Sequence, residues 1–337
     1  MRLSNCDPTL EQAWHPLARS RDVTGTPRKE RLLGVDWVLW RDAQGTVRAF
    51  VDQCPHRLAP LSLGSCEGSS LRCPYHGWLF NEEGVCVEIP ALGPDATLPS
   101  RAKLTAAAAV AESHGMVFIA PREPLTPLPS IDAATDSTYM AGDLPVLRTR
   151  GSAGLLADNF LDMAHFPFVH AGTFGADEVR EVPPYSVERE GYCFSAVYEH
   201  DFANREDPGV AAGIRPLVQR RRLTYRYVAP FHLELAIEFL DAGGANVIGF
   251  FLVPEDDDTV RVYSTLWRND LDFSEERMRE AVAFEIAVVE EDLALQSRFG
   301  DLRLPLDPTI ELHTKADRTT IELRRILADF VAAASAQ

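Results

Sequence analysis

Two short segments of this chain place sulfur and nitrogen donors close together. Cys54-Pro-His56 is followed, after a gap of sixteen residues, by Cys73-Pro-Tyr-His76. Each segment carries one cysteine and one histidine, so together they offer two thiolates and two imidazoles to bound metal. Proline and glycine residues in and next to both segments suit tight loops, in which backbone N–H groups can point at bound ligands.

The donor set fits two kinds of metal site. A zinc site can use two cysteines and two histidines, but such motifs usually pair cysteine with cysteine and histidine with histidine. In a Rieske [2Fe–2S] cluster, two thiolates hold one iron and two imidazoles hold the other. One ligand of each type per loop favours the Rieske cluster, with Cys54, His56, Cys73 and His76 as its ligands. Such a cluster predicts one-electron transfer.

A second group of donors lies in the segment from Asn159 to His170. It contains Asp162, His165 and His170, and two histidines with a carboxylate suit an iron(II) site that keeps positions open for O₂ and substrate. The spacing of the two histidines alone is more typical of ordinary core or surface residues. On an ideal helix they would point about 140° apart, so joint ligation needs a distortion, which Pro167 can supply. The cluster upstream favours the iron site, because O₂ activation needs electrons.

Bulk composition narrows the function further. The chain has 337 residues, 46% of them apolar and 25% charged, which suits one large or two smaller globular domains. The net charge of −17 argues against nucleic-acid binding. No run approaches the ~18 apolar residues of a membrane span, and the N-terminus lacks a signal-peptide core. The six scattered cysteines have no disulfide-framework spacing, so we expect a cytoplasmic protein.

The pattern of strands and helices predicts an α+β protein with two domains. Short strand-like runs and hairpin turns come first, then a proline-rich stretch at 121–130. Longer strand-like runs at 186–202, 220–241, 245–254 and 259–268 can form one large antiparallel sheet. Helices are predicted at 274–299 and 317–334. We place the all-β domain with its leading segment at 1–142 and the sheet-and-helix domain at 143–337.

The whole chain resembles the terminal oxygenase (alpha) subunits of Rieske non-heme iron oxygenases, in the subgroup of dicamba monooxygenase and vanillate O-demethylase. The motifs that carry this resemblance are Cys-Pro-His-Arg, Cys-Pro-Tyr-His-Gly-Trp and Asn-x-x-Asp-x-x-His-x₄-His, in the family's order. The segment from His313 to Arg318 also looks like that subgroup. The resemblance implies an N-terminal Rieske domain and a C-terminal helix-grip domain that holds mononuclear Fe(II).

The resemblance also implies roles for single residues. His165 and His170 match the two imidazole ligands of the iron. Asp162 matches an aspartate that bridges His165 to His76 of the neighbouring subunit, in a head-to-tail homotrimer. Asn159 matches an amide near the iron.

The third iron ligand is expected on the long helix, where Glu290, Glu291 and Asp292 are the candidates. Glu291 is predicted to point away from the apolar stripe and to be solvated; the stripe is formed by Val282, Ile286, Val289 and Leu293. Periodicity does not choose between the other two carboxylates. The resemblance favours Asp292, because the family's ligand is usually the aspartate of a Glu-Asp pair.

The expected activity is monooxygenation of a small organic substrate by O₂, either hydroxylation or oxidative O- or N-demethylation. Alternatives are arene cis-dihydroxylation, a biosynthetic desaturation or cyclisation, and a non-catalytic Rieske electron carrier. The chain has no Gly-x-Gly-x-x-Gly motif, so electrons from NAD(P)H are expected to arrive through a separate ferredoxin, flavin reductase or both.

The sequence offers several candidates each for the substrate pocket and for a surface that docks a redox partner. The aromatic and aliphatic candidates for the substrate pocket are Phe160, Phe166, Phe168, Phe231, Phe250, Leu252 and Trp267. His232 and Asn246 are candidates for orienting a polar substrate group, or equally surface strand residues. Basic residues that either dock an acidic ferredoxin or form a solvated face are Arg57, Arg72, Arg220, Arg221, Arg222 and Arg226.

Overall fold

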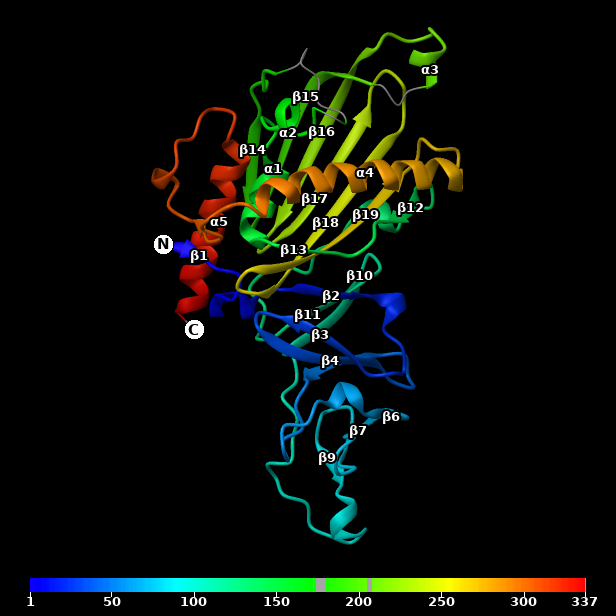
Figure 1. The fold of residues 1–337 in the computed structure, drawn as a ribbon, viewed down its shortest axis with the longest axis vertical. Coiled ribbons are helices and arrows are strands. Elements are labelled where there is room, and N and C mark those ends of the chain that lie inside the picture. Colours follow the sequence, from blue (N-terminus) through cyan, green and yellow to red (C-terminus); the bar gives the residue numbers. More distant parts are fainter. Residues whose placement is uncertain (172, 174–179, 205–207, 337) are drawn as a thin grey trace. The chain divides into compact units, whose positions relative to one another are not determined.

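The computed structural model describes residues 1–171, 173, 180–204 and 208–336 (Figure 1). It divides into two compact units, one formed by residues 1–9 and 129–337 and the other by residues 10–128. The division falls earlier in the chain than the boundary expected between residues 142 and 143. In the described part of the chain, no helix is both long and apolar enough to cross a membrane.

The unit of residues 10–128 is built from three small antiparallel sheets, as the all-β prediction requires. Their strand orders are β10-β11-β2, β3-β4-β5 and β6-β7-β8-β9. The strands are β2 (His15–Arg19), β3 (Arg28–Leu32), β4 (Val35–Arg41), β5 (Val47–Val51), β6 (Ser65–Glu67), β7 (Ser70–Arg72), β8 (Leu79–Phe80), β9 (Cys86–Glu88), β10 (Ala109–Ser113) and β11 (Met116–Ala120). Cys54 and Cys73 lie in the same buried core cluster as Trp40, Phe50 and Phe80.

The larger unit contains one eight-stranded antiparallel sheet, which confirms the expected α+β fold. Seven strands follow the order β12-β19-β18-β17-β16-β15-β14, and β13 also pairs with β19. The strands are β12 (Met140–Asp143), β13 (Leu147–Arg150), β14 (Ser186–Glu190), β15 (Cys193–Ala203), β16 (Val218–Val228), β17 (His232–Phe239), β18 (Ala245–Asp256) and β19 (Thr259–Arg268). A two-stranded pair, β1 (Arg2–Leu3) with β20 (Leu304–Pro305), completes this unit.

Two segments predicted as single strands are each two strands in the structure. The run 186–202 turns at Gly191, whose φ of 57° is a backbone conformation that glycine adopts without strain. The run 220–241 turns at residues 229–231, where Pro230 has no N–H to donate to a ladder. The apolar periodicity continues through both turns, so composition alone did not reveal them.

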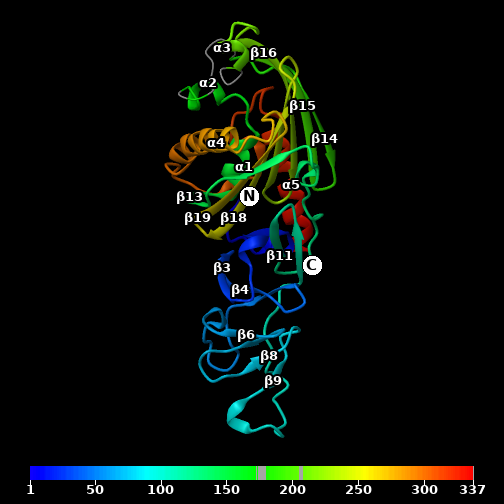
Figure 2. The same cartoon turned by 90° about the vertical axis from the view of Figure 1, so that its right-hand side faces the viewer.

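The described residues form five α-helices in the same unit as this sheet: α1 (Ala153–Leu161), α2 (Phe166–Val169), α3 (Pro208–Ala211), α4 (Glu275–Gln296) and α5 (Arg318–Ser335). Short 3-10 helices are η1 (Pro8–Gln12), η2 (Ser20–Asp22), η3 (Leu61–Leu63), η4 (Pro90–Leu92), η5 (Asp132–Ala134) and η6 (Pro308–Ile310). Helix α4 starts where the sequence predicted, because the Ser274 side chain accepts a hydrogen bond from the Arg277 N–H at 3.3 Å. It crosses one face of the sheet (Figures 1 and 2).

The rotation of α4 is set by close packing on β12. A Cβ at Gly142 would lie 2.5 Å from Met278 Sδ and 2.9 Å from Val282 Cγ2, so a larger residue there would displace these side chains of the helix. Val282, a member of the predicted apolar stripe, therefore faces β12. The side of α4 centred on Val288 lies about a third of a turn away from that stripe and borders a cavity over the sheet.

Candidate metal centres

The first cysteine–histidine loop closes on itself through backbone hydrogen bonds. The N–H of Cys54 donates to the carbonyl of Ala59 at 2.9 Å, and the N–H of Leu58 donates to the carbonyl of Cys54 at 2.8 Å. These two hydrogen bonds close a compact loop of six residues. Leu58, at the turn, has a φ of 56°, which is unusual for a residue with a side chain.

The second loop repeats this geometry. The N–H of Cys73 donates to the carbonyl of Trp78 at 2.8 Å, and the N–H of Gly77 donates to the carbonyl of Cys73 at 3.2 Å. Gly77 has a φ of 72° and occupies the position equivalent to Leu58. The two loops are therefore matched in backbone conformation, although one spaces its ligands as Cys-x-His and the other as Cys-x-x-His.

The four donors gather with their sulfurs inside and their imidazoles outside. Cys54 and Cys73 are 1% and 2% exposed, whereas His56 and His76 are exposed side chains. The two imidazole rings lie 4.4 Å apart between centroids, and His56 stacks on Trp78. Burial raises the pKa of the Cys54 thiol to about 11, and the thiolate is the form that binds metal. The arrangement fits a Rieske cluster.

Arg72, the last residue of β7, lies next to the second loop and does not form an open docking surface. Its guanidinium donates to the carbonyl of Gly77 at 2.6 Å, to Glu67 at 2.8 Å and to Glu88 at 2.9 Å. These bonds support the loop and compensate the positive charge.

Three of the other basic candidates are paired with carboxylates, whereas Arg221 is 8% exposed and donates to Nε2 of His200 at 2.8 Å. Arg220 and Arg222 donate to Glu199 on the neighbouring strand, and Arg226 pairs with Glu234. The interpretation as a solvated strand face therefore fits these residues better than a basic docking patch. Arg57 is exposed beside the first loop.

The second candidate centre begins where α1 ends. Asp162 accepts from the backbone N–H of Ala164 at 3.0 Å and from that of His165 at 3.1 Å, which turns the chain. Its Oδ2 also lies 3.0 Å from Nδ1 of the His165 ring. Burial alone would raise the pKa of the Asp162 carboxyl, but the hydrogen bonds from His165 and Ala164 outweigh it and lower the pKa. The ionised carboxylate holds the Nδ1 proton of His165.

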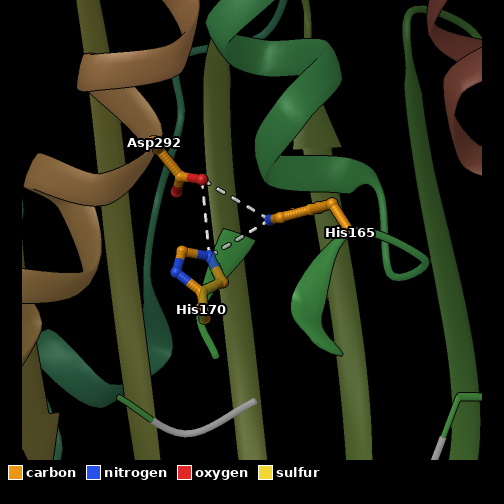
Figure 3. Close-up of side chains that lie close together, drawn as sticks. All are labelled: His165, His170 and Asp292. Atoms are coloured by element: carbon orange, nitrogen blue, oxygen red, sulfur yellow. Dashed lines mark hydrogen bonds and ion pairs between the residues drawn. The ribbon is translucent and has the colours of Figure 1, made fainter. Parts of the chain in front are cut away.

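The two histidines flank a single short helix. His165 immediately precedes α2, which includes Pro167, and His170 immediately follows it. The two residues thus do not share one continuous helix. The separation of about 140° expected for two residues five positions apart on an ideal helix therefore does not apply to them. Their Nε2 atoms face each other at 3.2 Å (Figure 3).

Asp292 on α4 completes a triangle with these two nitrogens. Its Oδ1 lies 3.5 Å from Nε2 of His165 and 3.4 Å from Nε2 of His170 (Figure 3). This oxygen is buried and accepts no hydrogen bond from the described residues. Glu290, the alternative candidate, is exposed and does not join the triangle.

The triangle has the size that a metal ion requires. With sides of 3.2, 3.4 and 3.5 Å, a point about 2 Å from all three atoms exists, which is the usual length of a metal–nitrogen or metal–oxygen bond. Two imidazoles and one carboxylate on one side of an ion are the donors of non-heme iron(II) oxygenases. The residues present therefore fit the iron that the sequence predicts.

Glu291 was expected to be solvated, and this prediction is wrong. Its Oε2 lies 2.8 Å from Nδ1 of His170, and the hydroxyl of Thr173 donates to the same oxygen at 2.9 Å. The error comes from the apolar stripe, which faces β12 and not the cavity. Three residues after Val288, Glu291 lies on the side of α4 that faces the histidines.

Asn159 is linked to the ligand helix rather than to a histidine. Its Oδ1 accepts a hydrogen bond from Nε2 of Gln296 at 3.2 Å, and Gln296 follows Asp292 by one helical turn. Helix α1, which carries Asn159, is tied to α5 by Arg324, which donates to both carboxylate oxygens of Asp158 at 2.6 and 2.9 Å. The position near the iron that the resemblance implies for the Asn159 amide therefore stays a prediction.

A mostly apolar cavity of about 140 Å³ opens beside the triangle. Its aromatic and aliphatic walls come from Phe160, Phe166, Phe202, Leu223, Tyr225, Leu235, Ile237, Phe239, Ile248, Phe284 and Val288. Of the two polar residues predicted for the pocket, His232 and Asn246, Asn246 lines this cavity.

Only part of the predicted pocket set lines this cavity. Phe160, Phe166 and Asn246 do, whereas Phe168 is 67% exposed. The remaining candidates are buried elsewhere in the core: Phe231, His232, Phe250, Leu252 and Trp267. Five of the wall residues that were missed alternate along β16 and β17, so strand periodicity was the available signal for them. The others are Phe202 on β15, Ile248 on β18, and Phe284 and Val288 on α4.

The fold and the two donor clusters define a class of protein. A Rieske-type domain precedes a domain in which a large antiparallel sheet and a long helix enclose a two-histidine, one-carboxylate centre. This is the architecture of a Rieske oxygenase subunit. Residues 13–106 match the Rieske [2Fe-2S] domain family.

Residues 150–333, more than half of the chain, match the family described as the vanillate O-demethylase oxygenase C-terminal domain, and the chain belongs to that family. The resemblance to Rieske terminal oxygenase alpha subunits is thereby confirmed, and with it the [2Fe–2S] and mononuclear iron cofactors of such proteins.

Individual relatives agree with this assignment. Methylxanthine N1-demethylase NdmA of Pseudomonas putida is 26% identical over 95% of this chain and 89% of its own length. Other curated relatives are matched over less of their length, such as chloroacetanilide N-alkylformylase oxygenase component of Rhizorhabdus wittichii (33% identity, 52% of this chain, 51% of the relative) and chlorophyllide a oxygenase of Oryza sativa subsp. japonica (33%, 50%, 30%). The chain thus spans about half of those two proteins or less.

Solved structures show the same fold. NdmA with caffeine superposes with a TM-score of 0.85 at 25% identity, over 98% of this chain and 93% of NdmA. Dicamba monooxygenase bound to 3,6-dichlorosalicylic acid gives a TM-score of 0.83 at 19% identity, over 97% and 99% of the two chains. The second likeness concerns the fold alone.

Proposed function

We propose that this chain is the terminal oxygenase component of a multicomponent system that inserts one oxygen atom of O₂ into a small organic substrate. The balanced reaction is R–H + O₂ + 2 e⁻ + 2 H⁺ → R–OH + H₂O. When R–H is a methoxy or N-methyl group, the hydroxylated carbon leaves as formaldehyde. The observation that carries the proposal is the convergence of His165, His170 and Asp292 beside an apolar cavity.

In this proposal, Cys54, His56, Cys73 and His76 hold the [2Fe–2S] cluster, and His165, His170 and Asp292 hold the mononuclear iron. Their geometry supports the assignment, since both donor sets have the composition and spacing of those centres. When bound, the iron supplies the activation of O₂, for which the cluster provides electrons.

The protein's own residues contribute orientation and exclusion of water. Asp162 fixes the Nδ1 proton of His165, so that Nε2 of that ring keeps its lone pair for the centre. The aromatic walls, among them Phe160 and Phe166, surround a bound substrate with apolar surface and keep bulk water from the reacting carbon.

Electrons come from a ferredoxin, a flavin reductase or both, and the exposed edges of His56 and His76 are the proposed point of entry. The transfer onward passes between subunits of a head-to-tail homotrimer, from His76 of one subunit to Asp162 of the next. The proposed location is the cytoplasm, where the free cysteines stay reduced.

The test of the activity is iron content together with substrate-dependent NADH oxidation, using a surrogate reductase and a panel of methoxyarenes and N-methyl compounds. We expect about three irons per chain and formaldehyde in proportion to NADH consumed. Two irons per chain with no oxidation of any compound would indicate an electron carrier, and cis-diol products would indicate a dioxygenase.

The test of the assembly is complementation between two inactive variants. His76→Ala and His165→Ala, mixed in one trimer, should restore part of the activity because an intact cluster then faces an intact iron site across an interface. Verified mixed trimers without activity, or a monomer by light scattering, would contradict the route between subunits.

A further inference from the structure

Two residues that line the cavity each carry a buried polar atom with no hydrogen-bond partner among the described residues. Asn246 on β18 is 4% exposed, and its side-chain carbonyl oxygen accepts no hydrogen bond. The hydroxyl of Tyr225 on β16 is in the same situation, in a side chain that is fully buried. A buried polar atom without a partner is unfavourable, and because Asn246 and Tyr225 both line the cavity, a ligand bound there can supply the missing hydrogen bonds.

We propose that Asn246 orients the substrate, and that the substrate is a neutral, single-ring compound with an O–H or N–H donor. This inference rests on the proposed function and names its substrate class. The size follows from the cavity volume of about 140 Å³, since a cavity of ~150 Å³ holds one benzene ring. The donor follows from the carbonyl oxygen of Asn246, which can only accept.

The neighbours of Asn246 favour a neutral group over an anion. Ile237 lies opposite Asn246 on one side of β18, and Arg268 lies opposite on the other. Arg268 donates to both oxygens of Asp270, at 2.9 and 2.7 Å, so its charge is compensated by a carboxylate. Arg221, the other arginine of the cavity lining, donates to Nε2 of His200 at 2.8 Å. An anionic oxygen placed against the Asn246 carbonyl would face the negative end of that dipole.

The position of Asn246 also sets which end of the substrate reacts. Its neighbour Arg268 borders a second cavity together with Glu280 and Ala281, in the first half of α4. Asp292 lies three turns later on the same helix. A ring whose donor binds Asn246 therefore directs its opposite end toward His165, His170 and Asp292.

The experiment compares three probes of one size on the full-length holoenzyme, without turnover, by fluorine NMR line broadening. The probes are 4-fluorophenol, 4-fluorotoluene and 4-fluorobenzoate. We expect 4-fluorophenol to bind about tenfold more tightly than the other two, because a site built to pair a hydroxyl disfavours analogues without one. Asn246→Leu should abolish this preference and leave 4-fluorotoluene binding unchanged.

Val288→Trp is the control, because an indole in the cavity should block all three probes and show that they bind there. Tightest binding of 4-fluorobenzoate, binding of no probe, or a preference that survives in Asn246→Leu would overturn the inference. The expected preference in a protein that never oxidises a substrate would instead overturn the proposed function and leave the cavity assignment standing.

A second inference concerns Glu291 and rests on different contacts. Glu291 Oε2 lies 2.8 Å from Nδ1 of His170, just as Asp162 Oδ2 lies 3.0 Å from Nδ1 of His165. Thr173 donates to the same oxygen of Glu291 and holds it in place. The geometry points to Glu291 as a positioning residue, whose carboxylate fixes the tautomer and orientation of His170 for the iron of the proposed function.

Equilibrium binding of Co(II) to the iron-depleted, cluster-containing protein tests this inference without turnover. Glu291→Ala should weaken Co(II) binding about 10–100-fold and alter its visible ligand-field spectrum. Glu291→Gln, which retains an acceptor, should recover part of the affinity. Glu290→Ala is the matched control, because this neighbouring carboxylate is exposed and should leave binding unchanged.

Cluster absorbance and thermal midpoint report on folding in every variant. Co(II) binding to Glu291→Ala within twofold of the wild type would overturn the positioning role. Wild-type Co(II) binding in His170→Ala would instead overturn the proposed iron site itself, so the two failures are distinguishable.

Discussion

The two metal-binding regions of this molecule differ in what they bury. In the loops around Cys54 and Cys73, the sulfurs are buried and the imidazoles are exposed. At the other centre the imidazoles are largely or fully buried: the side chain of His165 is 11% exposed and that of His170 only 1%. Both of these rings have a carboxylate on Nδ1, and Nε2 faces a third carboxylate.

This difference matches two different chemical tasks. Exposed imidazoles let an electron-transfer partner come within reach. Buried imidazoles beside an apolar cavity suit a reaction from which water must be excluded. The regions also differ in assembly: each loop closes through its own backbone, whereas the hydrogen bond between His170 and Glu291 joins residues 121 positions apart.

The sharpest test of this contrast is to empty one centre and leave the other intact. His170→Ala should lower iron content from about three to about two per chain and reduce turnover to background, because the triangle loses one of its three donors. Metal analysis and the visible spectrum measure both effects. Glu290→Ala should change neither, and loss of the cluster together with the iron would contradict independent centres.

The next largest effect is expected at the exposed centre. His76→Cys should lower the cluster's reduction potential by on the order of 100 mV or more, because an anionic thiolate stabilises Fe(III) better than an imidazole does. A spectroscopic redox titration measures this shift. Tyr75→Phe, a change at the adjacent exposed ring, should leave the potential close to that of the wild type. An unchanged potential in His76→Cys would refute the cluster assignment.

The buried centre is assembled from segments that are far apart in the sequence. We therefore expect the stability of its domain to depend on an ion pair distant from the histidines. Arg324 is 1% exposed and bonds Asp158 of α1 and Glu311. Arg324→Met should lower the free energy of unfolding by about 3–5 kcal/mol, because it leaves carboxylates without their buried partner. Urea denaturation measures it, and Arg325→Met, at a 61% exposed neighbour, should be nearly neutral. Equal effects of the two variants would rule out this anchoring role.

The smallest effects are expected from the left-handed turn positions of the two loops. Gly77→Ala should destabilise the protein by about 1–2 kcal/mol, because alanine is strained at a φ of 72° and its Cβ would lie 3.2 Å from Pro90. Leu58→Gly should stay within about 1 kcal/mol of the wild type, since relief of strain and added chain entropy oppose each other. Thermal unfolding compares them, and a neutral Gly77→Ala would show that the loops tolerate other turns.

The sequence by itself determined the chemistry of the two cysteine–histidine loops and much of the fold class. Cys54 and His56 lie within one short loop, as do Cys73 and His76. The short spacing of each pair in the sequence therefore already predicts that its two side chains are close in space. The start of α4 could also be predicted from nearby residues, because the Ser274 side chain caps the helix by accepting a hydrogen bond from the N–H of Arg277, three positions later. The histidine pair was recognisable from its motif, although its proximity comes from flanking α2 and not from a distorted helix.

Only the tertiary structure decided which carboxylates meet the histidines. Glu290, Glu291 and Asp292 are consecutive, and the apolar pattern of α4 gave the wrong environment for Glu291. The rotation of the helix is set by contacts of Met278 and Val282 with Gly142, more than 130 positions away. A helix's own periodicity describes its faces relative to one another, but packing on a remote strand selects the face that turns toward the site.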